Sequence, residues 1–175
     1  VIHACWDAAS IDRIHEFQNQ SNLLSYDMLV ESSKKETWQY QAIETILKGK
    51  ELELANGQSF FDKDGNARHE IRVRYWDKEA TTYNDVFLGP EHARTHIPDD
   101  PIVGDYLIEY EEHMPPVFLG HYWLDQDPVP LTGNIACVDY SVAKSGGKLV
   151  AYRWNGEQNL SRDNFVTVIR QEERA

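Results

Sequence analysis

The last third of this chain alternates short apolar runs with turn signals, and this pattern constrains the fold more than any other feature. Gly146-Gly147 and Asn155-Gly156 are pairs that favour tight reversals of the backbone. Short apolar runs bounded by such pairs are typical of strands. We therefore predict consecutive strands, antiparallel where the links are short, over Val117–Leu119, Ile135–Val138, Lys148–Trp154 and Phe165–Ile169.

The first part of the chain has a helical pattern. Apolar residues recur at helical spacing, as Ile11, Ile14 and Phe17 do, and Gly49 follows the last such segment as glycine follows many helices. The spacing predicts helices over Asp7–Gln20, Ser25–Ser33 and Thr37–Lys48. The last of them is expected to share one apolar face among Trp38, Ala42, Ile43, Ile46 and Leu47.

Length and composition fit a globular protein. With 41% hydrophobic residues among 175, the chain has enough apolar surface for one core. We expect a single domain over residues 1–175, with a helical segment at about 7–50 and a strand-rich part at about 115–170.

Net charge, apolar run length and cysteine context limit the binding partners and the cellular location that we expect for this chain. The 29 acidic and 17 basic residues give a net charge of −12, which argues against a nucleic-acid polymer as partner. No apolar run approaches the roughly 18 residues of a membrane span, so we expect no membrane partner. Cys5 and Cys137 both lie in apolar runs, as reduced, buried cysteines do. These features together predict a cytoplasmic protein.

Two histidines lie where predicted strands would deliver them to the edge of a sheet. Gly120-His121 ends the apolar part of Pro116–Trp123, and His3 lies in Val1–Trp6, which we predict to be a strand. Imidazoles at such places are common metal ligands. We predict that His3 and His121 share one metal site, with a hydrogen-bonded structural histidine as the alternative at each position.

The two histidines belong to a set of four segments that together match the motifs of a known family: His3-Ala4, Gly120-His121, Asn134–Ser141 and Gly146–Tyr152. In this order they resemble the C-terminal half of a calcineurin-like metallophosphoesterase, most closely the phosphoprotein phosphatase and diadenosine tetraphosphatase branch. The resemblance covers residues 1–6 and 115–154. It implies an α/β fold: the C-terminal half of a β-sandwich flanked by helices, with a helical segment inserted between the first and later strands.

The resemblance also implies an activity. Members of the family hydrolyse phosphomonoesters, phosphoproteins or dinucleoside polyphosphates at a binuclear site, where two divalent ions neutralise phosphate oxygens and activate water. It implies that His3 and His121 bind one of these ions. Mn, Fe, Zn and Ni are the metals that suit imidazole and carboxylate ligands together. The expected partner is thus a phosphorylated substrate.

The sequence also departs from the family pattern. The sequence lacks the Asp-x-His, Gly-Asp-x-x-Asp-Arg and Gly-Asn-His motifs that supply the family's other ligands and its catalytic histidine. We therefore expect the catalytic residues in a missing N-terminal segment of the same protein, and we expect the isolated chain to be inactive. Trp123 stands where many members carry a further histidine, which the phosphoprotein phosphatase branch does without. The alternative is a noncatalytic binding or regulatory domain that retains the phosphoesterase scaffold.

The middle of the chain offers one alternating run, Glu70–Trp76, which predicts a half-buried strand after a turn at Asp64-Gly65. Arg72 and Arg74 alternate along it and could bind a substrate phosphate, because guanidinium matches phosphate oxygens. A solvated strand face is the alternative. Asp139, within a matched segment, is either a structural hydrogen-bond acceptor or a catalytic group.

Overall fold

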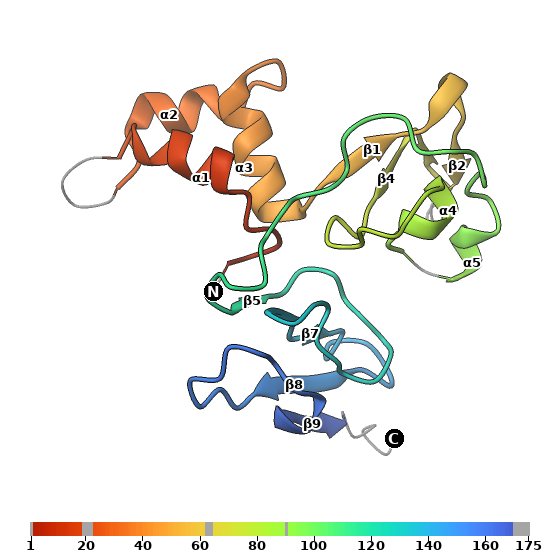
Figure 1. The fold of residues 1–175 in the computed structure, drawn as a ribbon. Coiled ribbons are helices and arrows are strands. Elements are labelled where there is room, and N and C mark those ends of the chain that lie inside the picture. The colour runs from red at the N-terminus through yellow and green to blue at the C-terminus, as the bar shows by residue number, and fades with distance from the viewer. Residues whose placement is uncertain (1, 19–22, 62–64, 90, 170–175) are drawn as a thin grey trace, which may run out of the picture. The chain divides into compact units, whose positions relative to one another are not determined.

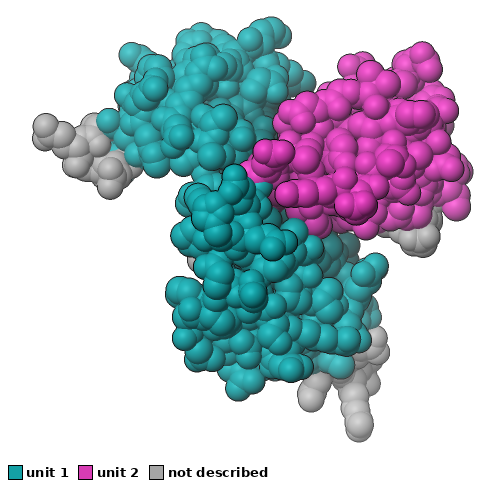
Figure 2. All heavy atoms as spheres, in the orientation of Figure 1, with its two compact units in different colours: residues 1–48, 110–175 teal, residues 49–109 magenta. Residues whose placement is uncertain are grey.

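The computed structural model describes residues 2–18, 23–61, 65–89 and 91–169. The chain divides into two compact units, teal and magenta in Figure 2: unit 1 comprises Val1–Lys48 and Tyr110–Ala175, and unit 2 comprises Gly49–Glu109. Helices and small sheets occur in both units, which confirms the mixed α/β class. The prediction of one domain over residues 1–175 stays a prediction.

Three helices form the helical part of unit 1, and all three helix predictions are confirmed with shorter bounds (Figure 1). They are α1 (Ala8–His15), α2 (Tyr26–Glu31) and α3 (Trp38–Lys48). Their apolar faces meet around a buried cluster of Ile14, Met28 and Ala42, against which Leu24, Trp38, Ile43 and Ile46 pack. Helical spacing therefore identified the residues that join these helices.

Local signals set the helix ends. The Ser25 hydroxyl accepts a hydrogen bond from the Met28 N–H at 3.1 Å and so caps the start of α2. Gly49 follows α3 with a φ of 86°, a left-handed conformation that glycine adopts without a Cβ clash. Among the described residues, no helix is long and apolar enough to cross a membrane.

Several apolar residues of the predicted helices are exposed, among them Leu29 at 53%, Phe17 and Leu47. Phe17 and Leu47 are each 44% exposed. Phe17 lies beyond the end of α1, where its ring packs beside that of Trp38 with 5.3 Å between centroids. Leu47 follows the packed Ile46 by one residue, and one residue turns a side chain about 100° around a helix. The predicted placement of Leu47 on the apolar face is therefore wrong.

The strand-rich part of unit 1 contains the four predicted strands and one more. They are β5 (Val117–Leu119), β6 (Ile135–Cys137), β7 (Asp139–Tyr140), β8 (Lys148–Tyr152) and β9 (Phe165–Ile169). β5 pairs with β6 in parallel, while β7, β8 and β9 form an antiparallel sheet in that order. A 3-10 helix at Arg162–Asn164 precedes β9. The antiparallel prediction is confirmed for the short links of this second sheet.

The two sheets differ in burial. All of β6 is buried, and so are both ends of β5. In the second sheet Val150 is buried, whereas Leu149 and Val168, which pair across β8 and β9, are 59% and 61% exposed. The parallel pair thus lies in the interior of unit 1, and one face of the antiparallel sheet is open to solvent.

The predicted strand Val1–Trp6 begins outside the described residues, and the prediction is wrong for residues 2–6, which form no strand. The Ile2 N–H donates to the Phe118 carbonyl of β5 at 3.0 Å. The next backbone groups turn away, because the Ala4 and Cys5 N–H groups donate to the Ile46 carbonyl at 3.1 and 3.4 Å. The chain therefore passes from β5 to the last turn of α3.

Short elements make up unit 2. They are β1 (Glu51–Glu53), a 3-10 helix (Ala55–Gly57), β2 (Phe60–Phe61), β3 (Ala67–Arg68), β4 (Glu70–Arg72), α4 (Tyr83–Val86) and α5 (Glu91–Arg94). β1 pairs with β4 and β2 pairs with β3, both antiparallel. Gly65 of the predicted turn has a φ of 79°, and Asp64 lies outside the described residues.

The strand predicted over Glu70–Trp76 ends early, at Arg72. Val73 forms only an isolated bridge to Phe87, and the Asp77 N–H donates to the Arg74 carbonyl at 2.9 Å. That bond closes a turn, so the backbone leaves the extended conformation. The predicted alternation of buried and less buried side chains nevertheless continues through residue 76.

Candidate functional site

The parallel pairing of β5 with β6 brings two polar residues to one edge of unit 1. His121 follows the end of β5, and Asp139 follows the end of β6. A Cβ placed on Gly120 would lie 3.7 Å from the Cβ of Asp139, so the two segments touch where their strands end. In α/β folds the carboxyl ends of parallel strands are the usual place for ligand sites.

His3 reaches the same edge through the backbone. The Gly120 N–H donates to the His3 carbonyl at 2.9 Å, which holds the N-terminal segment beside the end of β5. The imidazoles of His3 and His121 lie side by side, with 5.1 Å between ring centroids and 56° between planes. His3 is exposed and His121 is half-buried, and the Nε2 atom of His121 is itself buried. The structure thus brings together the two histidines predicted to share a metal.

His121 occupies a strained turn. Its φ is 72°, and the Tyr122 N–H donates to the Gly120 carbonyl at 2.9 Å across it. A hydrogen bond between residues two apart defines a γ-turn, and the form with positive φ at the central residue is the rarer and more strained one. A histidine in this position, where glycine would fit freely, has to be held by its surroundings.

Hydrogen bonds from the side chains of Tyr122 and Ser141 fix the backbone on the C-terminal side of His121. The buried Tyr122 hydroxyl donates to the Ala4 carbonyl at 3.0 Å, which ties the turn to the N-terminal segment. The Ser141 hydroxyl donates to the Trp123 carbonyl at 2.9 Å. Trp123 and Ser141 have φ values of 51° and 59°, so three non-glycine residues of this site are left-handed. Such conformations cost about 1–3 kcal/mol each and cluster at functional sites.

Asp139 has a structural contact of its own. Its carboxylate accepts a hydrogen bond from the Ser141 N–H at 3.2 Å, and its carbonyl accepts one from the Leu124 N–H at 3.0 Å. Both bonds help to fix the left-handed residues on either side of the site. These two bonds give Asp139 a structural role, and a catalytic role stays a prediction.

Gly146 and Gly147 are both needed for the turn between β7 and β8. Gly146 has a φ of 73°. A Cβ on Gly147 would lie 1.9 Å from the Ser141 carbonyl oxygen, a backbone atom that cannot move aside. The turn that positions Ser141 therefore depends on the close approach that only glycine allows.

The donor chemistry of the pair fits a divalent ion. Neutral imidazole suits Mn, Fe, Zn and Ni. Burial raises the pKa of the neighbouring Cys137 thiol to about 11, and its Sγ lies 3.8 Å from the Gly120 carbonyl oxygen. Within the described ranges, no group of three or more His, Cys, Asp and Glu side chains is arranged to hold an ion. The two imidazoles alone would leave an ion with open positions.

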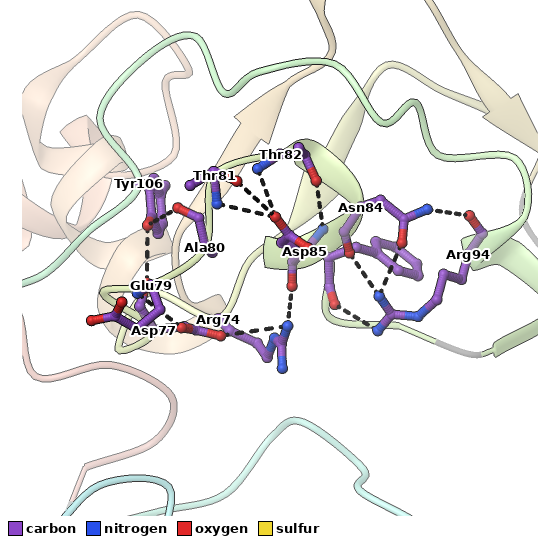
Figure 3. A network of polar contacts seen from close by, with 11 residues as sticks. Arg74, Asp77, Glu79, Ala80, Thr81, Thr82, Asn84, Asp85, Arg94 and Tyr106 are labelled. Atoms are coloured by element: carbon purple, nitrogen blue, oxygen red, sulfur yellow. Dashed lines mark hydrogen bonds and ion pairs between the residues drawn. The ribbon is translucent and has the colours of Figure 1, made fainter.

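The two arginines predicted to bind substrate lie in unit 2, and both have partners there. The Arg72 Nε lies 3.8 Å from the Glu51 carboxylate across the β1–β4 pair. The Arg74 guanidinium donates to the Asp85 carbonyl and lies 3.4 Å from the Asp77 carboxylate. Figure 3 shows Arg74 directed at these two partners. Phosphate binding by either arginine stays a prediction.

Asp85 organises the same network (Figure 3). It forms a capping box with Thr82 at the start of α4, in which each side chain bonds to the backbone of the other. Hydrogen bonds from the Thr81 N–H, and then from Thr82, hold the pKa of Asp85 below its usual value. The polar groups in this network thus serve the local fold.

Sequence reasoning missed Tyr122 and Ser141, which hold the turn. The left-handed residues that they hold are His121, Trp123 and Ser141 itself. A left-handed backbone is usually predicted from glycine, asparagine or aspartate, and none of these three is one of them. The Thr82-x-x-Asp85 box, by contrast, has a local sequence signal that could have been found.

A comparison of the chain with protein-family models, curated proteins and solved structures finds no match.

Proposed function

We propose that this chain is part of a metal-dependent phosphoesterase in which His3 and His121 hold one of two divalent ions. The 5.1 Å between their ring centroids carries the proposal, because the two residues come from distant parts of the sequence. The left-handed backbone at His121 supports it, since strain of about 1–3 kcal/mol is retained mainly where a function needs that geometry.

The chain's own residues have clear tasks in such a site. When bound, divalent ions neutralise phosphate oxygens and activate water. His121 is oriented by its turn, and His3 by the bond from the Gly120 N–H to its carbonyl. Tyr122 links the two segments through the Ala4 carbonyl, so the backbones that carry the two imidazoles are tied together in the folded chain. Such a link reduces the conformational freedom that the pair loses when it binds an ion.

The substrate class in this proposal is a phosphorylated molecule: a phosphomonoester, a phosphoprotein or a dinucleoside polyphosphate. A chain of net charge −12 repels anions, so local positive charge is needed to bind one. The remaining ligands and the catalytic groups come from a preceding segment of the same protein, and the setting is cytoplasmic. The isolated chain is accordingly inactive.

The second candidate is a noncatalytic binding or regulatory domain on the same scaffold. It agrees with the described residues, among which no group of three or more His, Cys, Asp and Glu side chains is arranged to hold an ion. Zinc binding by the histidines without hydrolysis agrees with both candidates, so the deciding observation is whether a preceding segment carries the Asp-x-His and Gly-Asn-His motifs.

Calorimetric titration of the 175-residue chain with Zn²⁺ tests the metal site. We expect one binding event that is at least tenfold weaker in His3→Ala and in His121→Ala. The matched control is His113→Ala, because His113 is an exposed histidine of the same unit whose Nδ1 lies 3.0 Å from a Glu111 carboxylate oxygen. It should bind zinc as the unaltered chain does.

Equal affinity in all four proteins would contradict the proposal, as would a loss that His113→Ala shares. A separate assay with p-nitrophenyl phosphate and Mn²⁺ tests whether the isolated chain holds a complete catalytic site. We expect no hydrolysis by the isolated chain, and robust metal-dependent hydrolysis would show that it already holds a complete site.

A further inference from the structure

Trp123 carries an exposed indole two residues after His121 in the sequence. It is 59% exposed, with a φ of 51°. Exposing a large aromatic ring and holding it on a left-handed backbone both oppose stability. Packing of unit 1 therefore does not account for the position of this side chain.

The backbone that carries the indole is nevertheless fixed on both sides. The Ser141 hydroxyl donates to the Trp123 carbonyl at 2.9 Å, and the Leu124 N–H donates to the Asp139 carbonyl at 3.0 Å. Tyr122, the preceding residue, is buried and bonded through its hydroxyl to Ala4. The ring is thus presented to solvent from a well-held turn, which limits the ordering cost of binding a ligand.

A lysine accompanies this ring. The Lys144 Nζ lies 4.8 Å from the centroid of the Trp123 ring. Within the described residues its ammonium forms no ion pair with a carboxylate, whereas Lys148, in the following strand, lies 3.3 Å from Asp127. In a chain of net charge −12, an ammonium that contacts an exposed indole and no described carboxylate is suited to an anionic ligand.

We propose that Trp123 and Lys144 form a binding site for small phosphate esters whose organic group is a planar aromatic ring. The indole stacks on that ring, and the Lys144 ammonium pairs with a phosphate oxygen. Nucleobases and simple aryl groups share this chemistry. Identifying such an ester as the substrate rests on the proposed function, because the link to His121 is that Trp123 follows it by two residues; the binding itself needs no metal ion.

The test is calorimetric titration of the full chain in EDTA with three probes: 5′-AMP, phenyl phosphate and ribose 5-phosphate. We expect the aromatic probes to bind on the order of tenfold more tightly than ribose 5-phosphate. Trp123→Ala should abolish this preference, and Trp123→Phe should retain part of it. Lys144→Ala should weaken all three probes.

Two control variants match the altered residues. Trp154→Ala removes an indole of similar exposure, 53%, from the link between β8 and β9. Lys34→Ala removes a positive charge that is already paired with Glu31. Both should bind the probes as the unaltered chain does, and circular dichroism should show all variants folded.

Tight binding of 5′-AMP alone supports the site with a nucleobase as its ring, and tight binding of both aromatic probes supports it for aryl groups in general. Equal affinity for all three probes overturns the proposal. So does a preference that survives Trp123→Ala or is lost equally in Trp154→Ala. Because EDTA removes metal, failure here leaves the zinc titration of His3 and His121 unaffected, and the reverse also holds.

Discussion

The turn after β5 in unit 1 and the start of α4 in unit 2 are held by the same kind of contact, a side chain bonded to the backbone. In unit 2, Asp85 accepts bonds from the Thr81 and Thr82 N–H groups at 3.1 and 3.0 Å. In unit 1, the Tyr122 and Ser141 hydroxyls donate to backbone carbonyls at 3.0 and 2.9 Å. The contacts are similar, but the backbones they hold differ.

At α4 the Thr82 hydroxyl accepts a bond from the Asp85 N–H, one of the groups that every helix start leaves open, and Thr82 has an extended backbone that suits a cap. Local structure explains these bonds. In the turn after β5, the bonds hold His121 and Trp123 in conformations that histidine and tryptophan disfavour. A hydrogen-bonded loop therefore gains functional interest when its bonds hold residues in backbone conformations that those residues disfavour.

Gly147→Ala should have the largest effect. The new Cβ would lie 1.9 Å from the Ser141 carbonyl oxygen, so the turn that positions Ser141 must distort. We expect a loss of about 3 kcal/mol in the free energy of unfolding, measured with urea. Gly120→Ala is the matched control, because its Cβ would meet only contacts of 3.7 and 3.8 Å. Similar losses in the two variants would show that the turn tolerates displacement.

His121→Gly should separate stability from binding. Removing the left-handed strain should raise the free energy of unfolding by about 1 kcal/mol, while zinc affinity in the calorimetric titration falls. His3→Ala serves as the comparison, since His3 is not among the residues with positive φ and should lose affinity without any gain in stability. A destabilised His121→Gly protein would mean that the side chain contributes packing that outweighs the strain.

Asp85→Asn should act on unit 2 alone and depend on pH. The hydrogen bonds that lower the pKa of Asp85, first the one from the Thr81 N–H, stabilise the charged carboxylate in the folded state. Their contribution is present above the unfolded pKa of 3.8 and is lost as the pH falls through the lower folded value. Amide exchange at Val86 should therefore be faster in Asp85→Asn at pH 7, with the difference shrinking in acid.

Asp105→Asn is the control for that experiment, since Asp105 is an exposed carboxylate with an ion pair to Lys50 at 3.5 Å. Its exchange rates at Val86 should match those of the unaltered chain throughout. A difference in Asp85→Asn that is constant from pH 7 into acid would rule out the titration of Asp85 as its cause.

Local patterns made most elements of unit 1 predictable, whereas in unit 2 they predicted only β4. Helical spacing located the three helices, and short apolar runs located β5, β6, β8 and β9. β7 was missed because two residues leave no alternation to detect, and the strand at Val1–Trp6 was wrong because Ile46, far along the chain, accepts the bonds that turn it. Periodicity reports which side chains are buried, and it carries no information on such distant backbone partners.

The candidate site was predictable in its histidines and not in its support. The apolar context of His3 and His121, with the family resemblance, predicted that the two lie together, and their rings are 5.1 Å apart although His3 lies in no strand. The turn at His121 has no sequence signal, since its positive φ depends on the Tyr122 bond to Ala4 and on Ser141. Tertiary contacts decide these conformations, so the turn emerges only once the segments are assembled.

Arg72→Ala should have the smallest effect and sharpen the contrast from the side of unit 2. The Arg72–Glu51 pair is 3.8 Å apart with both side chains about 40% exposed, and such surface pairs contribute roughly 0–1 kcal/mol. We expect a change in unfolding free energy below about 0.5 kcal/mol.

Titration of Arg72→Ala with 5′-AMP then decides whether Arg72 binds phosphate. Unchanged affinity, beside the loss expected in Trp123→Ala, would restrict ligand binding to unit 1. A loss matching that of Trp123→Ala would show that Arg72 binds phosphate despite its partner, because a guanidinium can exchange one exposed anion for another at little cost.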